Sequence, residues 1–80
     1  MFMYEKIEDI LNAYDLVYEA EGYNARPYEV EAHWIYEYVV TRDFTTQELA
    51  QYIHDVFKDL HGIKEDMSIF RAMALEIMEY

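Results

Sequence analysis

Apolar side chains recur along most of this chain at the three-to-four-residue spacing that is typical of amphipathic helices. Between about Met3 and Glu21 they form one stripe, which consists of Ile7, Ile10, Leu11, Tyr14, Val17 and Tyr18. Acidic residues lie on the opposite side, and Gly22 suits the position just past a helix end. The pattern therefore predicts a first helix over residues 3–21.

Residues 27–40 fit two periodicities. With a period of two, one face holds Tyr28, Val30, Ala32, Trp34, Tyr36, Tyr38 and Val40. With a helical period, Tyr28, Ala32, Ile35 and Val39 form the apolar stripe. We favour a helix, because strands usually run about 5–6 residues and no other segment offers a partner strand. The alternative is a strand over residues 28–40 that pairs across a dimer.

The third segment has the clearest local signals. Thr45 and Glu48 have the spacing of a capping box, and Gly62 followed by Ile63 indicates a Schellman ending. The pattern predicts a helix over residues 46–61, with one apolar stripe formed by Leu49, Ile53, Val56, Phe57 and Leu60.

The last segment begins near Glu65 and is apolar around most of its circumference. A helix of this kind is either central in the fold or buried in an oligomer. The four segments together predict an all-α protein, in which residues 1–80 form one small acidic domain of about four short helices. A homodimer through the last segment is a further expectation.

The net charge of the chain indicates what kind of partner such a domain binds. The chain has 80 residues with 17 acids and 6 bases, a formal net charge of -11, yet 54% of its residues are hydrophobic. Acidic disordered tails lack this apolar content, so the chain should fold. Nucleic-acid phosphates and anionic membranes would repel it, whereas a basic protein surface would attract it. With no cysteine and no spanning or targeting run, we expect a cytoplasmic protein.

The acidic side of the first helix and the second segment supply the candidate binding residues. Carboxylates four residues apart rise about 6 Å along a helix, and phosphates advance about 3.4 Å along a DNA strand. The acids can thus occupy some phosphate-equivalent positions, although an ordinary solvated helix face has the same pattern. Trp34 is either the anchor of an interface or a core residue. The predicted partner-binding residues are Glu5, Glu8, Asp9, Asp15, Glu19, Glu29, Glu37, Trp34 and Tyr36.

The histidines are candidate metal ligands. Glu29, His33 and Glu37 lie one above another on a helix, but three ligands on one straight helix seldom converge on a metal. We expect surface Glu–His contacts there and predict no metal and no cofactor. His54 and His61 are expected on the exposed side of the third helix. With one serine, no cysteine and no glycine-rich loop, the sequence predicts no enzyme.

Three classes of function follow. The favoured one is a small acidic module that occupies the basic, nucleic-acid-binding site of another protein. Phage anti-restriction and anti-CRISPR proteins and nuclease immunity proteins act in this way, which is a physical analogy without a shared sequence motif. The second class is an assembly subunit that homo-oligomerises through its apolar C-terminal helix. The third, a metal-dependent or small-molecule function at His33, ranks last.

Overall fold

The computed structural model describes residues 3–17 and 28–79 of the chain. Helix α1 spans Met3–Tyr14, α3 spans Glu29–Thr41, α4 spans Thr46–His61 and α5 spans Met67–Met78. The all-α prediction is confirmed, and the described part of the chain contains no strand. The alternative strand over residues 28–40 is wrong, because α3 occupies nearly all of that segment.

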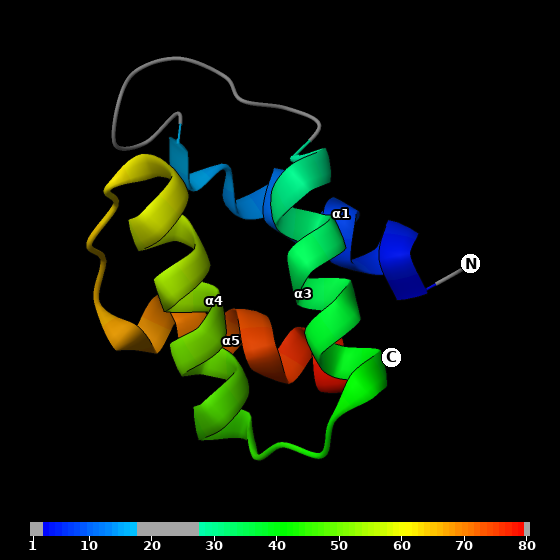
Figure 1. Ribbon diagram of the computed structural model, residues 1–80. Coiled ribbons are helices and arrows are strands. Elements are labelled where there is room, and N and C mark those ends of the chain that lie inside the picture. Colours follow the sequence, from blue (N-terminus) through cyan, green and yellow to red (C-terminus); the bar gives the residue numbers. More distant parts are fainter. Residues whose placement is uncertain (1–2, 18–27, 80) are drawn as a thin grey trace.

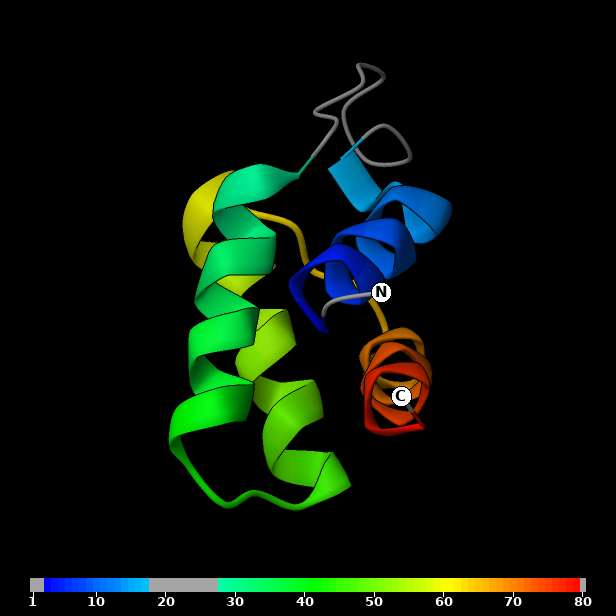
Figure 2. The ribbon, with the colours of Figure 1, turned by 90° about the vertical axis from the view of Figure 1, so that its right-hand side faces the viewer.

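The four helices are arranged as two crossed pairs. Helices α3 and α4 stand side by side, while α1 and α5 run across them behind, as Figure 1 and the rotated view in Figure 2 show. Helix α1 packs against α3 and α5, and α4 packs against α5 and α3. This arrangement places one flank of α3 beside α1 and the other flank beside α4.

The core lies between the two pairs and follows the helical stripes. In α3 the buried residues Ala32 and Ile35, together with Tyr28 just before the helix, are three of the four that the helical period predicted. The other buried apolar residues of the helices are Ile7, Ile10 and Leu11 in α1, Leu49, Ala50, Ile53, Val56 and Phe57 in α4, and Phe70, Met73, Ala74 and Ile77 in α5. The apolar periodicity therefore decides which face of each helix is buried.

Helix α4 begins and ends as its sequence predicts. The Thr45 side chain accepts a hydrogen bond from the Glu48 amide (3.2 Å), and the Glu48 carboxylate accepts one from the Thr45 amide (2.8 Å). At the other end Gly62 has a φ of 70°, which suits a glycine, and its amide donates to the Lys58 carbonyl. The Ile63 amide then donates to the Phe57 carbonyl, which completes the Schellman motif.

Two boundaries differ from the sequence prediction. Helix α1 ends at Tyr14 and not near Glu21, because Asp15 adopts a left-handed conformation with a φ of 49°. Helix α3 begins after Tyr28, which is also left-handed (φ 61°) and makes no side-chain cap. The buried Tyr28 hydroxyl donates to Asp15 Oδ1 and accepts from the Val17 amide at 3.2 Å. This long-range contact joins the two left-handed residues to each other.

Some apolar side chains remain exposed on the helices. Leu60, which was predicted in the core stripe of α4, is partly exposed, while Ile63 is buried just after the helix. In α5, Leu75 and Met78 are 48% and 45% exposed. Within the described residues, no helix has the length and apolarity needed to cross a membrane.

Candidate protein-binding face

Carboxylates from two helices gather where α1 lies against α3. Glu5 and Asp9 of α1 are exposed, Glu8 is half-buried, and Glu29 and Glu37 of α3 are exposed. Partial burial raises the pKa of the Glu8 carboxyl, and the charges of Glu29, Asp9 and Glu5 raise it further. Glu8 is thus close enough to Glu29, Asp9 and Glu5 for their charges to repel. Glu37 lies about two turns beyond Glu29 on α3, towards α4. We call these five acids the acidic face.

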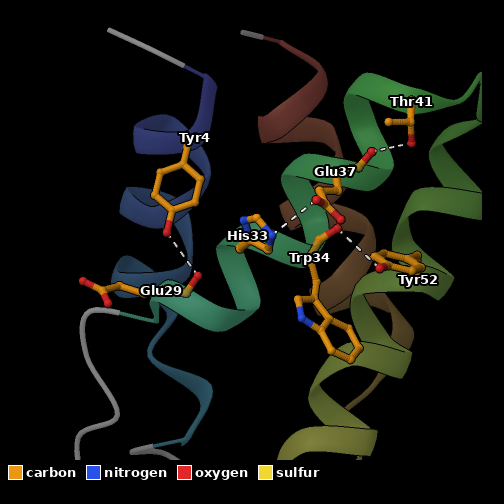
Figure 3. Close-up of polar contacts among 7 residues, drawn as sticks. All are labelled: Tyr4, Glu29, His33, Trp34, Glu37, Thr41 and Tyr52. Carbon is orange, nitrogen blue, oxygen red and sulfur yellow. Dashed lines mark hydrogen bonds and ion pairs between the residues drawn. The ribbon is translucent and has the colours of Figure 1, made fainter.

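Tyrosines join the two halves of the acidic face. The Tyr4 hydroxyl of α1 donates to the Glu29 carbonyl of α3 at 3.1 Å, as Figure 3 shows. The Tyr4 ring also meets Tyr36 edge to face, with centroids 6.0 Å apart. Burial, followed by the charges of Glu8 and Glu29, raises the pKa of the Tyr4 hydroxyl. Tyr36 therefore lies at the α1 flank of α3, half-buried beneath the acids.

Trp34 lies on the opposite flank of α3. Its side chain is on the α4 side of the helix in Figure 3, and the residue is 43% exposed, so the core interpretation is wrong. A helix turns about 100° per residue, which places Glu29, His33 and Glu37 on the surface between Tyr36 and Trp34. The outward side of α3 is therefore one continuous surface with an aromatic residue at each edge and acids between them.

The histidine on this surface makes a local contact. His33 Nε2 lies 3.3 Å from Glu37 Oε1, and both side chains are exposed. Among the described residues, no three histidine, aspartate or glutamate side chains are grouped so as to hold a metal ion. The expected surface Glu–His contact is present between His33 and Glu37.

Two predicted residues do not belong to the acidic face. The Asp15 carboxylate accepts the Tyr28 hydroxyl at the end of α1, so it has a structural partner and not a free surface position. Glu19 lies outside the described residues. The structure therefore brings together four of the seven predicted acids around Glu8, and Glu37 lies further along the outward side of α3. Trp34 and Tyr36 lie at the two edges of that side.

Sequence reasoning missed a buried polar pair between α3 and α4. Glu31 is buried, and its carboxylate contacts Nε2 of His61, which was expected at the surface but is largely covered. A signal for Glu31 was present, because it lies three residues after Tyr28 and four before Ile35 and so shares their helical face. Nothing in the sequence pointed to His61 as its partner.

A second polar contact joins α1 to α5. The Tyr14 hydroxyl donates to the Glu76 carboxylate, and this bond, with some burial, raises the pKa of Tyr14 to about 12. An open hollow of about 310 Å³ lies beside it, lined by Tyr14, Leu16, Glu65 and Ile69. Tyr14 therefore keeps its proton throughout the neutral range.

The sequence matches no family model, no curated protein and no solved structure at a significant level. Any statement about function therefore depends on the geometry and charge of the chain itself.

Proposed function

We propose that this protein is a binding module whose acidic face occupies a basic, nucleic-acid-binding site on a partner protein and so inhibits it. The observation that carries the proposal is the meeting of acids from two helices: Tyr4 of α1 donates to the Glu29 carbonyl of α3, and the charges of Glu8 and Glu29 lie close enough to repel each other. A cationic partner surface would relieve that repulsion, and a negatively charged ligand would increase it. The formal net charge of -11 acts in the same direction over longer distances.

Trp34 and Tyr36, the aromatic residues at the edges of this surface, also support its role as a protein interface. Tyrosine and tryptophan provide large contact areas with few rotatable bonds, and they are enriched at the centres of protein interfaces. Trp34 is the single tryptophan of the chain, and it is partly exposed on a helix that also bears the exposed apolar residues Val30 and Val40. A face that only kept the protein in solution would need charge but not these side chains.

The test is capture of partners from a lysate of the source organism at low and at high salt. The matched variants carry equal changes of charge, with Asp9→Lys and Glu37→Lys on the acidic face and Glu65→Lys and Glu79→Lys near the two ends of α5. We expect the wild type and the α5 double variant to capture the same basic protein at low salt, and the face variant to lose it.

The captured protein then decides the mechanism. We expect it to bind nucleic acid when alone and to release that nucleic acid when this protein is added. Equal capture by all three proteins would contradict a role for the acidic face. A partner that holds nucleic acid and this protein together would contradict inhibition by occupation of the same site.

An assembly subunit is the second candidate, and the exposure of Leu75 and Met78 on α5 favours it. The deeply buried α5 residues Met73 and Ile77 belong to the protein's own core, so substitutions there would test folding and not assembly. Leu75→Ser is the cleaner test, because Met78 also accepts a hydrogen bond from Thr46. This candidate predicts an oligomer in high salt by sedimentation, and a monomer after Leu75→Ser.

A further inference from the structure

The surface around Trp34 has the components of a site for one particular cationic side chain. Glu37 follows Trp34 by three residues, so its carboxylate projects from the same side of α3, one turn further on. Burial raises the pKa of the Tyr52 hydroxyl, and the charge of Glu37 also raises it. The same hydroxyl donates to the Trp34 carbonyl at 3.3 Å. Glu37, Tyr52 and Trp34 therefore lie together along the line where α3 meets α4.

One guanidinium already lies over an aromatic ring along the contact between α3 and α4. The Arg42 Cζ atom lies 4.9 Å from the centroid of the Tyr38 ring, and Tyr38 stacks on Tyr52 with centroids 4.2 Å apart. Trp34 is 43% exposed, and among the described residues its ring makes no stacking contact with another ring and no cation–π contact. Indole is the most favourable of the aromatic rings for this kind of contact.

We propose that Trp34 and Glu37 form a subsite for an arginine side chain of the basic partner. Arginine fits better than lysine, because its planar guanidinium stacks on an indole and at the same time donates hydrogen bonds to a carboxylate. The ammonium group of lysine is compact and strongly hydrated, so it gains less from the ring. This inference rests on the proposed function and names the chemistry that the α4 edge of the acidic face selects.

The experiment compares an arginine-only and a lysine-only peptide of equal length, each with a fluorescent label, by anisotropy at low salt. We expect the wild type to bind the arginine peptide about two- to five-fold more tightly than the lysine peptide. Trp34→Leu should abolish this preference by weakening arginine binding alone, and Trp34→Phe should keep part of it. Circular dichroism checks that both variants remain folded.

Two controls separate stacking on Trp34 from other effects. Val40→Ala removes an exposed apolar side chain from the same helix and should leave the preference unchanged. With unlabelled peptides, the emission of the single tryptophan of the wild type should shift more with the arginine peptide than with the lysine peptide.

The outcomes distinguish the two proposals. Equal binding of the two peptides by the wild type, lost in both cases after Asp9→Lys and Glu37→Lys, would overturn the arginine subsite and leave the acidic face intact. A preference that survives Trp34→Leu would also overturn it. Failure of either peptide to bind at low salt would contradict the proposed function itself.

Discussion

Along the sequence this protein divides into an α1–α3 half and an α4–α5 half, and the ends of the helices are set differently in each. In the α4–α5 half, neighbouring residues in the sequence set the boundaries, with a capping box at Thr45, a left-handed glycine at Gly62 and an aspartate cap at Asp66. In the α1–α3 half, α1 ends at a left-handed Asp15 and α3 starts at a left-handed Tyr28 without a side-chain cap. A left-handed residue other than glycine costs roughly 1 kcal/mol, so these ends are held by contacts from elsewhere.

The difference matters because the acidic face belongs to the α1–α3 half, in which the helix ends are not set by local capping residues. Its carboxylates repel one another around Glu8, and its helix α3 also buries a carboxylate at Glu31. Natural proteins depart from local consistency mainly where function requires it. We infer that the α4–α5 half supplies the stable base and that the α1–α3 half carries the strained surface.

The largest expected effect comes from the buried Glu31–His61 pair, which joins α3 to α4. His61→Ala leaves the Glu31 carboxylate buried without its histidine partner, and this should destabilise the protein by about 3 kcal/mol. The measurement is the free energy of unfolding in urea.

The matched control is His33→Ala, which removes an exposed histidine contact and should cost less than about 0.5 kcal/mol. The double variant Glu31→Leu with His61→Leu should recover most of the lost stability, because two apolar groups replace the pair. A small loss for His61→Ala would mean that the Glu31–His61 pair contributes little to joining the halves.

The next effect tests the long-range contact that holds the two left-handed residues. Tyr28→Phe keeps the buried ring but removes the hydroxyl, which leaves the Val17 amide without this acceptor and Asp15 without this donor. We expect a loss of about 2 kcal/mol from the free energy of unfolding. Tyr36→Phe removes a hydroxyl from a half-buried ring and serves as the control. Equal losses would show that the contact has no special role.

These contrasts explain what the sequence was able to predict. The helical faces follow from periodicity, because burial of one stripe is repeated many times along each segment. The ends of α4 follow from capping residues within four positions of each terminus. The end of α1 does not, since it depends on a hydroxyl thirteen residues away at Tyr28. Likewise, the acids on each helix were predictable, but their meeting at Glu8 required the packing of α1 against α3.

A smaller effect sharpens the description of the α4–α5 half. Thr45→Ala removes one side of the capping box, and the expected loss is about 1 kcal/mol, the value for an ordinary helix cap. Thermal unfolding followed by circular dichroism gives the change, with Thr41→Ala near the end of α3 as the control. A loss of several kcal/mol would show that the start of α4 also depends on distant contacts, and the contrast between the halves would fail.

The smallest effect is a gain of stability within the acidic face. Because the pKa of Glu8 in the folded protein lies above its ordinary value of 4.5, the folded state holds this proton more tightly than the unfolded state. The contribution of Glu8 to stability is therefore complete below pH 4.5 and is lost as the pH rises through the raised pKa.

Glu8→Gln should raise the thermal midpoint slightly at neutral pH, and the gain should disappear in acid and shrink in high salt. Glu65→Gln, outside the acidic face, is the matched control. A neutral-pH midpoint that falls in Glu8→Gln would mean that this carboxylate stabilises the fold, and the strain assigned to the α1–α3 surface would have to lie elsewhere.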